Sequence, residues 1–281
     1  MSFTAIVGAG AIGGALAHRL AAGDRVRQVR LIDVDGAVAA GKALDIQQSA
    51  AVEGFCTRIS AAGALEAAAG ADVVVIADPA RGDGEHRGEI GLALVRRIAA
   101  MDADAPLLFA GAGQRELMTR TAGELRVGRQ RIVGSAPGAL QGAVRALTAL
   151  EVNGAGADVQ LLVLGAPPDA AVVTWEAATI SGQPASTLIP PHRLAAISGR
   201  LPSLWPPGPL ALAAAAARVV EAVVNGARRR FTCFVVLDEP PARGTVVAMP
   251  VEVGPGGVRH VHRPALSRQE QTLLDNALVR G

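Results

Sequence analysis

Three closely spaced glycines near the N-terminus constrain the fold more than any other feature of the sequence. Residues 3–7 are apolar and lead directly into Gly8-Ala9-Gly10-Ala11-Ile12-Gly13, and residues 11–21 have helical spacing and good helix-forming side chains. A second apolar run, residues 29–34, carries Asp33 at its end. This order and these lengths predict a strand, a glycine turn, a helix and a second, parallel strand.

In a turn that binds phosphates, each of the three glycines has a separate physical role. The first permits a tight turn, the second lets the backbone approach a pyrophosphate, and the third lets the helix lie close to the sheet. The free amides at the helix start and the helix dipole favour bound phosphates. We therefore predict a dinucleotide site that contains Gly8, Gly10, Ala11, Ile12, Gly13 and Asp33.

Asp33 selects between the two nicotinamide dinucleotides. Its carboxylate can accept hydrogen bonds from the ribose hydroxyls of adenosine, and its charge repels a 2′-phosphate, so NAD is favoured over NADP. A glycine turn without a ligand is the alternative, because the GxGxxG pattern alone is a weak signal.

Further along the chain, strand and helix patterns alternate up to about residue 139. The predicted strands are 71–77, 106–112 and 131–134, the predicted helices are 37–49, 90–101 and 116–125, and 79–87 is a polar, glycine-rich loop. Such alternation predicts a Rossmann-type doubly wound parallel sheet in residues 1–139. In residues 140–281 helices 139–149, 210–227 and 267–278 accompany strands near 158–164, 170–180, 231–237 and 245–253, which predicts an α+β domain.

Composition excludes several classes of function. The 281 residues carry a net charge of +2 and only 2% aromatic side chains, which argues against nucleic acid or a charged membrane surface as a partner. No apolar run reaches the roughly 18 residues of a membrane span, and no signal segment is evident. Cys56 and Cys233 are predicted to be buried free thiols, and the chain is predicted to be cytoplasmic.

The chain resembles the malate/lactate dehydrogenase family along nearly its whole length. The resemblance is carried by GAGAIGGALA with LIDVD, by GKALDIQQSA, by ADVVVIADPARGDGEHRGEIG, by RIVGSAPGALQGAVR, and by the C-terminal segments TCFVVLDE, MPVEVGPGGV and LSRQEQTLLDNAL. It implies NAD as cofactor, a small carboxylic acid as substrate, and a homo-oligomer, either dimer or tetramer.

The resemblance also assigns the positions of the catalytic residues, and most of these positions hold a different residue here. The family's L-D-x-x-R segment is Leu140-Gln141-Gly142-Ala143-Val144, so Gln141 replaces the aspartate and Val144 replaces the arginine that clamps the substrate carboxylate. The family's G-x-H-G-D is Gly165-Ala166-Pro167-Pro168-Asp169, so Pro167 replaces the proton-transferring histidine. Gly113 stands where the family has an asparagine.

Two loop arginines are retained at the family's spacing. By resemblance, Arg87 would polarise the substrate carbonyl and Arg81 would face a second carboxylate, although both can also be solvated loop residues. A surrogate acid or base would have to come from His86 in the same loop or from His192 in a proline-broken region. His260 and His262 alternate on the last strand without an obvious third ligand, so no metal site is predicted.

The sequence thus predicts an NAD-binding protein of the 2-hydroxy acid oxidoreductase family with its catalytic residues replaced, that is, a pseudoenzyme or an enzyme altered in malate and lactate oxidation. One alternative is an active NAD-dependent oxidoreductase that uses Arg81 and Arg87 on an unusual 2-hydroxy or 2-oxo acid. The other is a non-enzymatic interaction or regulatory protein.

Overall fold

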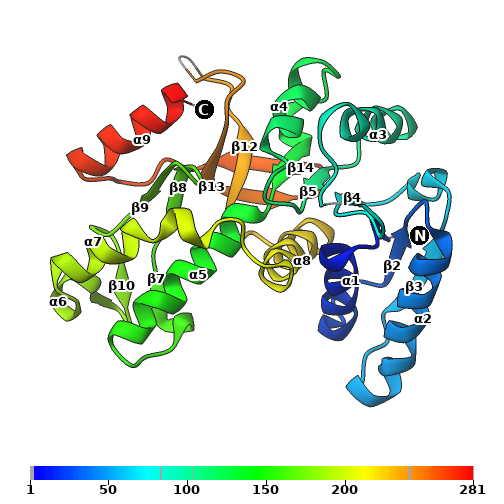
Figure 1. Cartoon of the computed structure of the whole chain (residues 1–281), viewed down its shortest axis with the longest axis horizontal. Helices are drawn as coiled ribbons and strands as arrows, with labels where there is room; N and C mark the ends of the chain where they lie inside the picture. The colour runs from blue at the N-terminus through cyan, green and yellow to red at the C-terminus, as the bar shows by residue number, and fades with distance from the viewer. Residues whose placement is uncertain (1–2, 83, 103, 240–241, 281) are drawn as a thin grey trace.

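One continuous sheet runs through most of the molecule (Figure 1). The structure, a computed structural model, describes residues 3–82, 84–102, 104–239 and 242–280. The strand order is β3-β2-β1-β4-β5-β6-β12-β13-β8-β9, with β14 beside β13. The first six strands are parallel to one another, whereas β12, β13, β14, β8 and β9 pair in antiparallel fashion.

The six parallel strands form a doubly wound unit with helical crossovers. The strands are β1 (Thr4–Val7), β2 (Gln28–Ile32), β3 (Arg58–Ala62), β4 (Val73–Ile76), β5 (Leu107–Phe109) and β6 (Ile132–Gly134). The helices among them are α1 (Ala11–Gly23), α2 (Gly36–Glu53), α3 (Gly88–Met101) and α4 (Arg115–Gly123). This order places a switch point between β1 and β4, where ligands bind beyond the carboxyl ends of the strands. The predicted Rossmann-type fold is confirmed.

Every residue of β1 and β4 is buried, as expected for strands covered on both faces. The short strand β3 has a mixed sequence, RISAA, with partly exposed side chains, and the apolar pattern gave no indication of it. Helix α8 packs against α1 and α5, and Figure 1 shows it between these two helices. The main hydrophobic cluster accordingly includes residues from both halves of the chain.

The second half adds helices and antiparallel strands around a smaller cluster. Its helices are α5 (Ala136–Glu151), α6 (Ala185–Leu188), α7 (Pro191–Gly199), α8 (Pro209–Asn225) and α9 (Arg268–Arg280). Its strands are β7 (Val159–Gln160), β8 (Val163–Ala166), β9 (Ala170–Val173), β10 (Thr179–Ile180), β11 (Gln183–Pro184), β12 (Arg230–Val236), β13 (Val246–Gly254) and β14 (Gly257–Val261). The predicted domain boundary at 139/140 falls within α5 and stays a prediction.

The prediction that both cysteines are buried is wrong for Cys56. Cys233 lies in β12 without exposure, and burial raises the pKa of its thiol to about 12. Cys56 is exposed because the extended chain after α2 alternates, directing Phe55 and Thr57 inward and the residue between them outward. The Asp24 carboxylate fixes this segment by accepting the amide of Cys56 at 2.8 Å.

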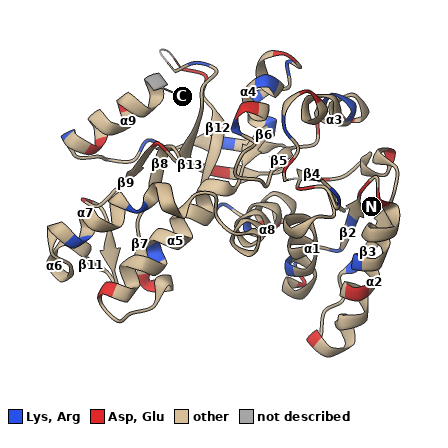
Figure 2. Cartoon of the chain, viewed as in Figure 1, with Lys and Arg blue, Asp and Glu red and all other residues tan. Residues whose placement is uncertain are grey.

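Charged side chains of both signs are interspersed over the ribbon (Figure 2). Within the described residues, no helix is both long enough and apolar enough to span a bilayer.

The last helix begins with a capping box formed by Ser267 and Glu270. The Glu270 amide donates to Ser267 Oγ at 3.3 Å, and Glu270 Oε2 accepts the Ser267 amide at 2.9 Å. The other oxygen of this buried carboxylate accepts the Glu176 amide at 3.1 Å, which ties α9 to the strand region beside it.

Ser267→Ala removes the cap, so we expect it to lower the free energy of unfolding by about 1 kcal/mol. Thr272→Ala is the control, because it deletes a hydroxyl in the same helix that bonds only the Arg268 carbonyl. Urea denaturation followed by circular dichroism compares the two variants, and equal effects would contradict a role for the cap.

Candidate cofactor site and catalytic pocket

The glycine turn lies between β1 and α1 and brings the helix against the sheet. Gly8 has φ of 109°, a left-handed conformation that favours glycine. A Cβ on Gly13 would overlap the Gly8 carbonyl oxygen, so the close approach of helix and turn depends on the missing side chain. From α2, Lys42 Nζ donates to the carbonyls of Ala9 and Gly10 at 2.6 and 2.8 Å, which fixes the turn from its outer side.

Asp33 lies just beyond β2, next to the turn, as predicted. It is 5% exposed, and its carboxylate is surrounded by backbone amides of this chain. Oδ2 accepts from Ala9 and Ala80, both at 2.8 Å, and Oδ1 accepts from Asp35 at 2.9 Å. The residue therefore connects β1, β2 and the loop after β4, and its predicted bonds to a ribose stay a prediction.

A second carboxylate, which the sequence did not predict, accepts hydrogen bonds from the amides that are predicted to bind phosphates. Asp78 Oδ2 accepts from the Ala11 amide at 2.7 Å, and Oδ1 accepts from Ile12 and Gly13 at 2.9 and 3.0 Å. Asp78 follows β4, which neighbours β1, and parallel strands end at the same edge of a sheet. An acidic residue just after the strand that neighbours β1 was the sequence signal from which this contact could have been predicted.

The loop after Asp78 also directs its side chains toward the cofactor crevice. Glu85 accepts the Ala112 and Gly113 amides, beyond β5, at 2.8 and 2.7 Å. Arg87 lies 3.6 Å from Glu85, and a Cβ on Gly113 would overlap its guanidinium. The two predicted arginines therefore separate: Arg87 lies beside the β5 loop, whereas Arg81 is ion-paired with Asp35 at the start of α2.

His86 lies in the same loop and is partly buried. Burial lowers the pKa of its imidazole, and the carboxylates of Asp33 and Asp78 oppose that shift. The histidine that the sequence offered as a surrogate acid thus lies in the electrostatic field of the glycine turn and its carboxylates. Its predicted role in proton transfer is not tested by these contacts.

The three residues at positions that the resemblance assigns to catalysis have packing or hydrogen-bonding roles. Val144 is completely buried in an apolar cluster with residues of β8, β9 and α7. Gln141 Oε1 accepts the Thr232 hydroxyl of β12 at 2.5 Å. Pro167 is buried just beyond β8. Arg145, one residue beyond Val144, donates instead to the Ala157 carbonyl at 3.1 Å.

The remaining histidines form no metal cluster in the part of the chain that the structure describes. His260 and His262 stack edge to face with ring centroids 4.5 Å apart, as their alternation on the strand predicts. His192 is exposed at the start of α7, and His18 Nε2 lies 2.8 Å from Glu53 on α2.

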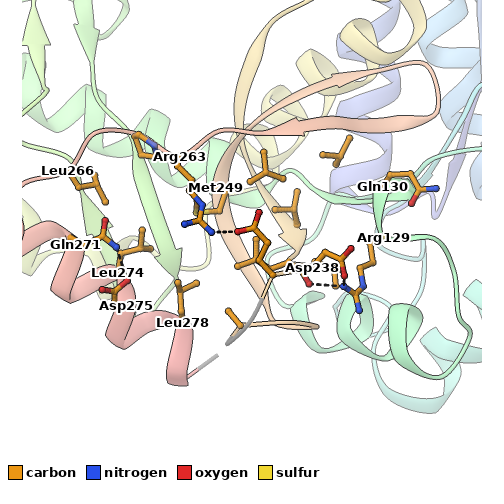
Figure 3. A pocket seen from close by; sticks show the side chains of 18 residues that line it. Arg129, Gln130, Asp238, Met249, Arg263, Leu266, Gln271, Leu274, Asp275 and Leu278 are labelled. Carbon is orange, nitrogen blue, oxygen red and sulfur yellow. Dashed lines mark hydrogen bonds and ion pairs between the residues drawn. The ribbon is translucent and has the colours of Figure 1, made fainter.

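A cavity of about 450 Å³ lies between α9 and the β12–β13 hairpin (Figure 3). Leu266, Leu274 and Leu278 line one side of it, and the ion pairs Arg263–Glu239 and Arg129–Asp238 lie at its polar side. None of the predicted cofactor or catalytic residues lines this cavity.

The predicted dinucleotide site fits its ligand in one respect and conflicts in another. The glycine turn brings the start of α1 close to the edge of the sheet, with the backbone amides that a pyrophosphate requires. The carboxylate of Asp78 does not fit, because it accepts hydrogen bonds from the same three amides that the phosphates need.

The chain is similar over nearly its whole length to known malate dehydrogenases. Residues 4–101 match the family model described as lactate/malate dehydrogenase, NAD binding domain. Malate dehydrogenase of Desulforudis audaxviator is 33% identical over 98% of this chain and 96% of its own, and that of Chloroherpeton thalassium is 30% identical over 96% and 93%. The solved malate dehydrogenase of Salinibacter ruber covers 100% of this chain and 95% of its own at 26% identity, with a TM-score of 0.88.

The contact between Gly13 and Gly8 gives a test of the turn. Gly13→Ala forces Cβ against a backbone oxygen, so we expect a loss of about 1–3 kcal/mol in the free energy of unfolding. Gly41→Ala on α2 is the control, because a Cβ at that position meets nothing within 4 Å. Denaturant unfolding of both variants measures the difference, and a Gly13→Ala protein as stable as Gly41→Ala would refute the close contact.

Proposed function

Because the chain belongs to the lactate/malate dehydrogenase family, we propose that it binds NAD through residues 4–101 and lacks ordinary malate or lactate dehydrogenase activity. The proposed loss of activity rests on the buried Val144. This residue occupies the position assigned by resemblance to the arginine that clamps the substrate carboxylate. A fully buried aliphatic side chain offers a carboxylate neither charge nor hydrogen bonds.

Proton transfer is lost at the neighbouring positions as well. Oxidation of a hydroxy acid needs a base at the hydroxyl while hydride leaves the carbon, and the reverse reaction needs the conjugate acid. Pro167 has no titratable group, and Gln141 is held by Thr232 and carries no charge with which to orient a histidine. Loss of general acid–base help alone costs roughly 10²–10⁴-fold in rate.

One observation favours an active enzyme with altered chemistry as a second candidate. Arg87 is 62% exposed at its side chain and lies beside the loop after β5, where it can meet an anionic ligand. Arg81, engaged with Asp35 near the glycine turn, gives this candidate less support. A non-enzymatic role, cytoplasmic location and homo-oligomerisation remain proposals from the sequence and the family.

Steady-state assays test the proposed loss of activity. With NADH and either oxaloacetate or pyruvate, we expect turnover far below the order of 10 per second that is usual for enzymes. Turnover near that level in the unmodified protein would refute the proposal. If the protein is instead an active enzyme that uses Arg87, Arg87→Ala abolishes its activity. Arg97→Ala is the matched control, because Arg97 is an exposed arginine on α3.

NAD binding is tested separately from turnover. A ligand present at 100 times its dissociation constant adds about 2.7 kcal/mol of stability, which raises the midpoint of thermal unfolding. An unchanged midpoint at millimolar NAD, together with no heat of binding in calorimetry, would contradict the proposed cofactor.

A further inference from the structure

Asp78 makes with the start of α1 the contacts that a phosphate group makes with such a turn. Its two carboxylate oxygens take three consecutive amides, those of Ala11, Ile12 and Gly13, at 2.7–3.0 Å. A negative group at this end of a helix is stabilised by the amides and by the helix dipole. We propose that Asp78 is an internal competitor for the phosphates of NAD, and that the dinucleotide binds only when this carboxylate is displaced from the amides.

The space beside Gly10 supports direct competition. The missing side chain of Gly10 is the feature that lets a pyrophosphate approach the backbone. In this chain a Cβ on Gly10 would overlap the Asp78 carboxylate and come within 2.6 Å of the Pro79 carbonyl oxygen. The volume that a dinucleotide needs is therefore occupied by this chain, and the negative charge of the carboxylate also repels a phosphate placed beside it.

Independent contacts hold the segment after Asp78 over the same crevice. The Ala80 amide donates to Asp33, the residue expected to bind a ribose. Arg81 pairs with Asp35 beyond β2, and Glu85 accepts two amides beyond β5. Asp78 is thus one of several attachments that link β4 to the neighbouring β1, β2 and β5 loops.

The consequence is a weakened apparent affinity for NAD. If the binding-competent arrangement is a minor fraction of the protein, the apparent dissociation constant rises by the inverse of that fraction. This inference rests on the proposed function, because it presumes that the site takes NAD. Asp78 is accordingly a residue that sets cofactor affinity.

Calorimetric titration with NAD tests the competition in the full-length protein and its variants. Asp78→Ala removes the internal anion, so we expect NAD to bind about 10- to 100-fold more tightly than to the unmodified protein. Asp78→Asn keeps the size of the side chain and removes its charge, and we expect a smaller gain in the same direction. Asp45→Asn is the control, because Asp45 is exposed on α2 in the groove that contains Gly10 and Ala11.

Asp45→Asn removes the same charge near the turn without any contact to the three amides, so its affinity should stay within a few-fold of the unmodified protein. An equal gain in Asp45→Asn and Asp78→Asn would overturn direct competition in favour of a general charge effect. Circular dichroism checks that each variant is folded, and Asp78→Asn carries the test if Asp78→Ala does not fold.

The pattern of binding separates the two proposals. Equally tight binding of NAD to the unmodified protein and to both Asp78 variants overturns the competition and leaves the proposed function standing. Absence of NAD binding in all folded variants overturns the proposed function, and the competition with it.

Discussion

The rest of the N-terminal half depends on the contact between Gly8 and Gly13, where a strand turns into a helix without side chains in between. The Gly8 carbonyl oxygen lies where a Cβ on Gly13 would be, so α1 begins directly at the edge of the sheet. This places the first amides of α1 at the switch point between β1 and β4. These amides have no partner within the helix, so a side chain, a ligand or water must satisfy them.

Asp78 satisfies them from within the chain, so the start of α1 has hydrogen-bond partners without a ligand. A bound dinucleotide would release the carboxylate to other partners or to solvent, so the two arrangements exchange one set of charge-assisted hydrogen bonds for another. The same logic applies to Asp33 and Glu85, whose carboxylates accept amides that border the crevice. The cofactor half is therefore organised around carboxylate–amide contacts within the chain.

Local patterns predicted much of this arrangement, and contacts between distant segments account for what they missed. The glycine spacing, the position of Asp33 and the capping box at Ser267 are short-range signals that survive in the structure. Asp78 contacts Ala11, Ile12 and Gly13, which are separated from it by 65 to 67 positions in the sequence. Its role therefore depends on the order of the strands in the sheet. Arg81 and Arg87 share one loop, yet their directions are set by Asp35 and Glu85, which a spacing argument cannot supply.

The buried Val144 fits the apolar surroundings of its position on α5. An arginine at position 144 would have to lie among the apolar side chains that now surround Val144, and an unpaired buried charge costs several kcal/mol. Valine instead gains about 1.5–3 kcal/mol from burial. Without an anionic partner for such a cation, packing favours the aliphatic residue. Because Gln141 accepts a hydrogen bond from Thr232 on another element, the effects of substitutions at positions 141 and 232 are coupled.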